Sequence, residues 1–162
     1  SSMSPWVVTI EALEPFRVQG PEQEPKVLPY LEYDGLKNYD INLEVAIQPK
    51  NEAETIVSVS NFKYMYWNMA QQLAHHSVNG CNIEACDMYA SGTISGPTED
   101  SFGSMLELTW SGKNPIKMND GSERKFINDN DTVIMKGYCQ NSSVRIGFGE
   151  VSSKLLPPFV RK

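Results

Sequence analysis

The clearest pattern along the chain is an alternation of apolar and polar residues over residues 40–47. One face carries Ile41, Leu43, Val45 and Ile47, and the other carries Asp40, Asn42, Glu44 and Ala46. Such alternation predicts a half-buried antiparallel strand. Residues 55–59 are rich in β-branched residues and follow a turn at residues 49–52, so we expect the two strands to form a hairpin.

After this hairpin, the spacing of the apolar residues changes from that of a strand to that of a helix. Over residues 61–78, apolar and aromatic side chains recur at steps of three and four, which predicts one long helix of about 27 Å. Ser60 or Asn61 could cap its start, and Asn79 with Gly80 could end it. His75 and His76 lie about 100° apart on a helix and cannot both face one ligand. We expect one of them to be packed and the other to be exposed.

The chain after residue 82 is predicted to be β to its end. The expected strands are residues 87–94, 104–110, 114–118, 125–127, 131–138 and 144–151, with a hairpin turn at Asn119-Asp120-Gly121. Gly147 and Gly149 alternate in the last strand, which indicates that something packs closely on its backbone. The predicted fold class is mainly β with one long helix (α+β), a mixed sandwich or roll in one domain over residues 1–162.

Residues 90–110 are predicted to form two strands joined by a loop of turn formers. In the second strand, Leu106 and Leu108 would share one face, and Glu107 would point the other way. A carboxylate that is buried there without a partner would cost several kcal/mol, on the order of the desolvation of a charge. Glu107 therefore either faces solvent or holds a partner.

The composition narrows the classes of partner. The net charge is −6 and the sequence pI is about 4.9, which argues against nucleic acid or an anionic membrane as the main partner. There is no apolar run of the ~20 residues that span a membrane. Residues 1–13 lack the pattern of a secretory signal, and the three cysteines lack zinc-site spacing, so we expect reduced thiols in a cytoplasmic protein.

Six blocks of sequence closely resemble the fumarylacetoacetate hydrolase family. They are SPWVV at 4–8, NFKYMYW at 61–67, QQLAHHSVNGCN at 71–82, ASGTISGP at 90–97, FGSMLEL at 102–108 and GYCQ…RIGFGE at 137–150. The blocks follow the family's order and span the whole chain. They resemble only the C-terminal part of the family's catalytic domain, so we expect the fold of that part alone, without the N-terminal domain.

The resemblance implies metal-dependent hydrolysis of the C–C bond of 4-fumarylacetoacetate, a small diketo acid, to fumarate and acetoacetate, the last step of tyrosine and phenylalanine degradation. It implies a homodimer with Mg²⁺ and Ca²⁺. The family's glutamate, which pairs with a water-activating histidine, corresponds to Glu107, and its substrate-binding threonine corresponds to Thr93. A hydroxyl residue near the magnesium corresponds to Ser1. The catalytic histidine and the acidic metal ligands would lie upstream of this sequence.

Hydrolysis of a 1,3-diketone needs a deprotonated water, a stabilised oxyanion and an enolate leaving group. Glu107 would orient the histidine base and stabilise the imidazolium that forms. Because this chain supplies neither that histidine nor an acidic cluster, we expect it to be inactive alone. Two alternatives stay open: a non-catalytic folded fragment or assembly-forming half-site, and another diketone or keto-acid enzyme of the superfamily, an isomerase or decarboxylase.

Overall fold

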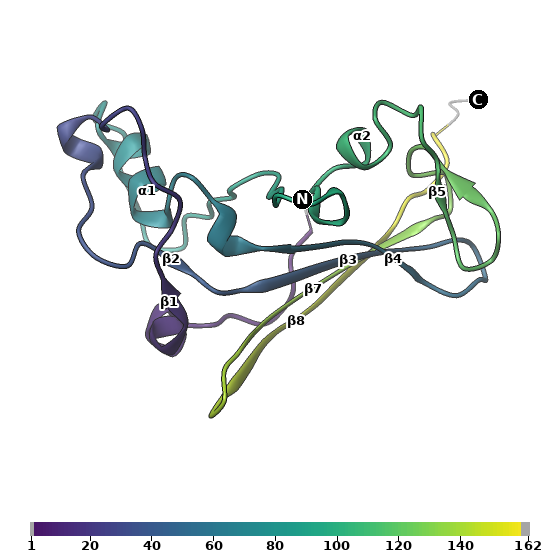
Figure 1. The fold of residues 1–162 in the computed structure, drawn as a ribbon, viewed down its shortest axis with the longest axis horizontal. Helices are drawn as coiled ribbons and strands as arrows, with labels where there is room; N and C mark the ends of the chain where they lie inside the picture. Colours follow the sequence, from purple (N-terminus) through teal and green to yellow (C-terminus); the bar gives the residue numbers. More distant parts are fainter. Residues whose placement is uncertain (1, 160–162) are drawn as a thin grey trace.

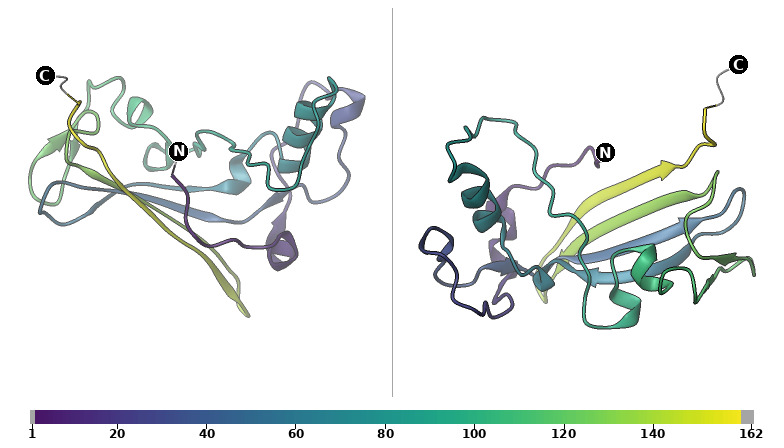
Figure 2. Two further views of the ribbon diagram at one scale, coloured as in Figure 1. Left: turned by 180° about the vertical axis from the view of Figure 1, so that it is seen from behind. Right: turned by 90° about the horizontal axis from the view of Figure 1, so that it is seen from above.

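The centre of the fold is a four-stranded antiparallel sheet in the order β4-β3-β7-β8 (Figure 1). The structure is a computed structural model that describes residues 2–159. The sheet strands are β3 (Asn42–Gln48), β4 (Thr55–Asn61), β7 (Thr132–Gln140) and β8 (Arg145–Lys154). Figure 2 shows the four strands side by side, with β4 and β8 at the edges and the short helix α1 (Met69–Ser77) beyond one end.

These four strands confirm the alternating and β-branched segments predicted from the sequence, and β3 and β4 form the expected hairpin. The turn between them is closed by a hydrogen bond from the Glu52 amide to the Pro49 carbonyl (3.1 Å). Between the pairs Val45–Ser58 and Ala46–Ile56 the register shifts by one residue, so Val57 of β4 is the extra residue of a β-bulge. The bulge lies in β4, whereas β3 keeps its register with β7 without a shift. Ala46 and its neighbour Ile47 are both buried, so the predicted single apolar face is lost there.

The main hydrophobic cluster forms where η1 (Ile10–Phe16) packs against the sheet. Its buried members are Leu13, Phe16, Tyr39, Ile41 and Cys139. Burial raises the pKa of the Cys139 thiol to about 11, because the low-dielectric surroundings disfavour the thiolate. Cys81 and Cys86 are exposed, and all three cysteines are free thiols.

The N-terminal segment docks on the last strand at Gly149. Ser4 Oγ donates to the Phe148 carbonyl (2.7 Å), and the Trp6 amide donates to Ser4 Oγ (3.0 Å). Gly149 has φ +72°, and a Cβ there would overlap the Trp6 indole. The close packing predicted from the alternating glycines is therefore confirmed at Gly149, whereas Gly147 faces open space.

The predicted helix over residues 61–78 is wrong in its extent. Residues Phe62–Tyr64 form the 3-10 turn η3, which Asn61 caps, and the α-helix α1 begins only after Asn68. Asn68 and Gln71 form a capping box: the Gln71 amide donates to Asn68 Oδ1 (2.8 Å), and the Asn68 amide donates to Gln71 Oε1 (3.1 Å). This reciprocal pair satisfies two amides at the start of α1 and so fixes where the helix begins.

The remaining elements are short and lie around the sheet. They are β1 (Arg17–Val18), η2 (Pro29–Leu31), β2 (Asn38–Tyr39), η4 (Glu99–Ser101), α2 (Met105–Leu108), β5 (Ile116–Lys117) and β6 (Glu123–Arg124). The Asn119-Asp120-Gly121 turn joins β5 to β6 as predicted, although both strands are shorter than expected and β6 ends before residues 125–127. The predicted fold class, mainly β with a minor helical part, is confirmed. No helix in the described part of the chain is long and apolar enough to cross a membrane.

Candidate active site around Glu107

The segment that carries the predicted site residues contains no strand. The strands predicted over residues 87–94 and 104–110 are wrong: the first stretch has no regular structure and the second contains α2. Ser104 is the N-cap of α2, and its Oγ accepts a hydrogen bond from the Glu107 amide (3.3 Å). This local bond gives the backbone an alternative to a sheet ladder. Leu106 and Glu107, which were predicted to lie on opposite faces, are both exposed.

The helix α2 ends after one turn because of Thr109. Its Oγ1 donates to the Met105 carbonyl (2.7 Å) and accepts from the Gly112 amide (2.9 Å), and the residue is fully buried. The next two residues, Trp110 and Ser111, have positive φ angles of 49° and 59°. This sharp turn leaves Glu107 on a short, exposed helical turn above the sheet.

The Glu107 carboxylate is held by two serine hydroxyls. Ser95 Oγ lies 2.8 Å from Oε1 and 3.0 Å from Oε2, and Ser104 Oγ donates to Oε2 at 2.6 Å. The last distance is typical of a short, charge-assisted O–H···O⁻ bond. The carboxylate is solvent-exposed and also has partners, so the structure combines the two alternatives that the sequence left open.

The Ser95 hydroxyl reaches Glu107 because the chain turns back at Gly103. The Gly103 amide donates to Ser95 Oγ (3.1 Å). A Cβ at Gly103 would lie 2.7 Å from both the Ile94 carbonyl oxygen and Thr93 Cγ2, so only glycine allows this approach. Ser58 Oγ of β4 donates to the carbonyl of the neighbouring residue 102 (2.7 Å), which ties this loop to the edge of the sheet.

The structure links two of the three predicted site residues through the contacts between residues 93–95 and 103–107. Thr93 is exposed and lies against Gly103, and Glu107 is bonded to Ser95, two residues further along the same segment. Ser1, the predicted metal contact, lies outside the described residues. Among residues 2–159, no group of three or more His, Cys, Asp or Glu side chains is arranged to hold a metal ion.

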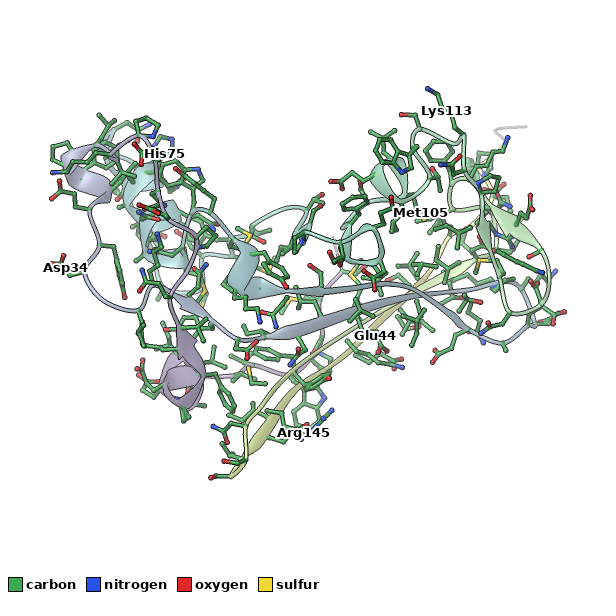
Figure 3. All side chains as sticks on the ribbon, viewed as in Figure 1. Asp34, Glu44, His75, Met105, Lys113 and Arg145 are labelled. Carbon is green, nitrogen blue, oxygen red and sulfur yellow. The ribbon has the colours of Figure 1, made fainter. Side chains whose placement is uncertain are left out.

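Both histidines of the chain lie on α1, away from Glu107. Figure 3 shows His75 at one end of the molecule, well separated from Met105 on α2. His75 Nδ1 lies 3.0 Å from the Tyr30 hydroxyl, and the two rings stack. His76 meets Tyr89 edge-on. Both histidines are exposed, so the expectation that one would be packed is wrong.

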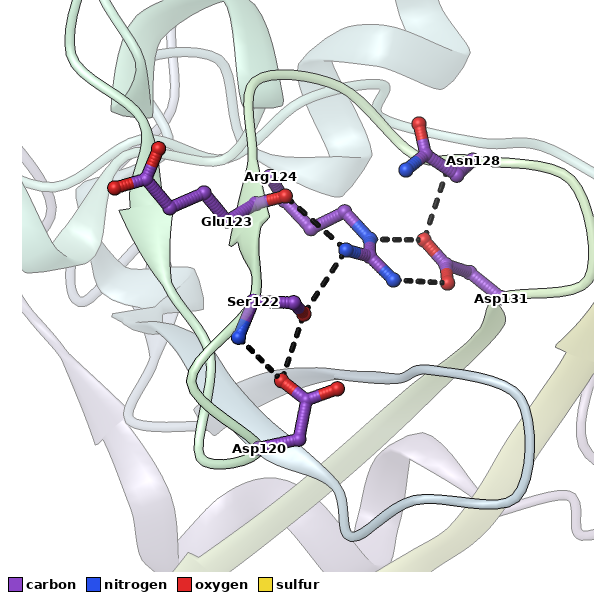
Figure 4. Close-up of polar contacts among 6 residues, drawn as sticks. All are labelled: Asp120, Ser122, Glu123, Arg124, Asn128 and Asp131. Atoms are coloured by element: carbon purple, nitrogen blue, oxygen red, sulfur yellow. Dashed lines mark hydrogen bonds and ion pairs between the residues drawn. The ribbon is translucent and has the colours of Figure 1, made fainter.

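A second carboxylate, Asp131, forms a closed ion pair that the sequence did not reveal (Figure 4). Arg124 donates from Nε to Oδ2 (2.8 Å) and from Nη2 to Oδ1 (2.9 Å), and the Asn128 amide also donates to Oδ2 (2.9 Å). Burial by itself would raise the Asp131 pKa, but the hydrogen bonds from Arg124 and Asn128 outweigh it and lower the pKa. This pair has its donors within the chain and is structural.

Sequence reasoning missed Ser95 and Ser104 as partners of Glu107. One signal for Ser104 was present, since Ser104-Met105-Leu106-Glu107 matches the S-x-x-E pattern of a helix N-terminus. This signal was missed because the spacing of Leu106 and Leu108 suggested the period of a strand. For Ser95 the sequence holds no comparable signal, because its contact with Glu107 depends on the path of the loop between them.

This arrangement can be compared with known proteins. Residues 1–155 match the family described as Fumarylacetoacetate (FAA) hydrolase C-terminal, and the chain belongs to this family. Over 159 residues it is 55% identical to fumarylacetoacetase of Bos taurus and 54% identical to fumarylacetoacetase of Homo sapiens, covering 97% of this chain and 38% of each relative. It is 51% identical to fumarylacetoacetase of Dictyostelium discoideum over 160 residues. The chain therefore spans about 38% of the length of these curated relatives.

Proposed function

We propose that the chain is the C-terminal part of the catalytic domain of an enzyme that hydrolyses 4-fumarylacetoacetate to fumarate and acetoacetate. Family membership and about 50% identity to proteins named fumarylacetoacetase support this activity. The observation that carries the proposal is the Glu107 carboxylate, which two hydroxyls orient at an exposed position without any cation of its own in the described chain.

In this proposal Glu107 is the carboxylate of a His–carboxylate pair. It accepts a hydrogen bond from the imidazole of a histidine in the part of the enzyme upstream of this sequence, fixes its tautomer and stabilises the imidazolium that forms when water is deprotonated. Thr93 is exposed two residues before Ser95, which holds this carboxylate, and its hydroxyl can donate to a substrate oxygen. The carboxylate and the substrate contact would thus come from one folded segment.

The proposal includes features that depend on the rest of the enzyme. We infer Mg²⁺ and Ca²⁺ as cofactors, with Ser1 near the metal and the acidic ligands upstream. A cytoplasmic homodimer acting at the end of tyrosine and phenylalanine degradation completes the proposal.

The test uses the full-length protein with 4-fumarylacetoacetate as substrate and measures formation of fumarate and acetoacetate. Glu107→Gln keeps the shape of the side chain but removes its charge, so kcat should fall about 10²–10⁴-fold. Glu99→Gln, an exposed carboxylate on η4, is the matched control and should leave kcat unchanged. Release of CO₂ from a keto acid without cleavage of the diketone, or full activity in Glu107→Gln, would overturn the proposal.

A second experiment assays the 162-residue chain alone, without the rest of the proposed enzyme. It should show no turnover of 4-fumarylacetoacetate, because Glu107 then lacks the histidine that it orients. The measurement is the same product assay at high protein concentration. Hydrolysis by this chain, abolished by Glu107→Gln, would show that the base lies within residues 1–162 and would contradict the assignment of that base to the upstream region.

A further inference from the structure

We propose that Ser95 and Ser104 are positioning residues that fix the Glu107 carboxylate for catalysis, with Oε1 as the oxygen presented to the histidine. This inference rests on the proposed function of Glu107. Neither serine needs to touch the substrate in this role. Both act through the carboxylate.

The direction of each hydroxyl proton follows from the hydrogen bonds around it. A serine hydroxyl has one proton to donate. An ionised carboxylate can only accept, so the Ser95 proton points to it, while one of the two lone pairs of Ser95 Oγ accepts from the Gly103 amide (3.1 Å). Ser104 Oγ accepts the amide of Glu107 itself (3.3 Å) and donates back to Oε2 of the same residue (2.6 Å). Both donors are thus fixed by backbone amides.

The two oxygens of Glu107 are left unequal by this arrangement. Oε2 accepts from Ser104 and lies within 3.0 Å of Ser95 Oγ, whereas Oε1 has Ser95 alone, at 2.8 Å. An ionised carboxylate has about four acceptor positions, so Oε1 keeps the greater spare capacity. A histidine N–H that approaches from solvent would therefore meet Oε1 in a fixed orientation.

A purely structural role does not account for this geometry. Ordering an exposed glutamate costs side-chain entropy, and water could solvate the carboxylate equally well. The two hydroxyls instead converge from positions nine residues apart, on opposite sides of the loop that turns back at Gly103. We call the two serine hydroxyls of Ser95 and Ser104 the clamp. Because Ser95 lies two residues after Thr93, the clamp also ties the carboxylate to the segment that carries the proposed substrate contact.

The first test is steady-state kinetics of Ser95→Ala and Ser104→Ala in the full-length protein. Loss of a positioning contact should lower kcat about tenfold to a hundredfold with little change in KM, because a small misplacement of a catalytic group is costly. The matched control is Ser122→Ala, which removes another serine–carboxylate hydrogen bond, to Asp120 (2.7 Å), away from this cluster. Unchanged kcat in both serine variants would overturn the proposal.

Two further variants separate the clamp from the helix cap that Ser104 also provides. Ser104→Thr keeps both the cap and the donor, so it should restore most of the activity lost in Ser104→Ala. Ser104→Asp keeps a good cap but cannot donate when ionised. It should unfold at nearly the wild-type temperature and still lose kcat. Wild-type kcat in Ser104→Asp would show that only capping matters and would overturn the role of Ser104.

A double-mutant cycle with Glu107→Gln completes the test. If Ser95 acts through Glu107, Ser95→Ala should cost little further kcat once Glu107→Gln is present, so the two effects should not add. Additive effects would overturn the positioning role and leave the proposed function intact. Full activity of Glu107→Gln alone would overturn the proposed function instead, so the two failures are distinguishable.

Discussion

Two carboxylates of this chain show opposite ways of holding a negative charge. Asp131 is 1% exposed, and Arg124 and the Asn128 amide give it three hydrogen bonds. Glu107 is exposed, its side-chain partners are neutral hydroxyls, and one of its oxygens keeps acceptor capacity to spare. A charge that is fully paired within its own chain supports the fold, whereas a charge that is held in place but keeps an unused acceptor position is available to a partner.

The largest expected effect on stability follows from breaking the buried Arg124–Asp131 pair. In Asp131→Asn the Arg124 guanidinium keeps its burial but loses its charge partner, and removal of one partner from a buried pair costs about 3–5 kcal/mol. Chemical or thermal unfolding of the full-length protein measures this loss. Asp120→Asn, at an exposed carboxylate of the neighbouring turn, is the control and should cost much less. A loss below about 1 kcal/mol in Asp131→Asn would break the distinction between the two carboxylates.

A smaller effect is expected where the N-terminal segment docks on the sheet. Gly149→Ala places a Cβ at a positive φ, which costs roughly 1–2 kcal/mol, and displaces the Trp6 indole as well. Gly147→Ala, two residues earlier on β8, introduces a methyl group into open space. The melting temperature should therefore fall clearly in the first variant and little in the second. Equal effects of the two alanines would contradict the docking of Trp6 on Gly149.

Low pH should remove part of the stability that the Asp131 carboxylate contributes to the folded protein. The folded pKa of this carboxyl is lower than its usual value near 3.8, so its ionised form stabilises the protein above that value. The stabilisation is lost as the pH falls through the lowered folded pKa. The difference in unfolding free energy between wild type and Asp131→Asn should thus shrink below about pH 4. A difference that stays constant down to pH 2 would contradict this linkage.

The sheet was largely predictable from the sequence, because alternation and β-branching report strands whose faces differ in burial. The bulge at Val57 was not, since an extra residue in one strand changes the register without changing the composition. The same reasoning failed for the segment around Glu107, where it predicted strands that the structure does not contain. Leu106 and Glu107 are both exposed although they were predicted to lie on opposite faces, and hydroxyl–carboxylate bonds rather than a ladder hold the segment. The apparent alternation therefore did not reflect burial.

Local capping signals could have corrected two of these errors. Asn68 stands three residues before Gln71, with which it forms a reciprocal capping box, and Ser104 stands three residues before Glu107, whose amide it caps. Each marks the true start of a helix. The roles predicted for Glu107 and Thr93 came from the family resemblance, and they stay predictions. The Arg124–Asp131 pair spans a loop, and neither period nor motif reports such contacts.

The most direct test of the central claim is kcat of Glu107→Gln in full-length protein that unfolds at the wild-type temperature. Because Glu107 is exposed and its clamp is not part of the core, the substitution should change the unfolding free energy by no more than about 0.5 kcal/mol. We expect kcat to fall about 10²–10⁴-fold in that folded enzyme. Wild-type kcat together with a large loss of stability would show that Glu107, like Asp131, serves the fold, and would contradict the account.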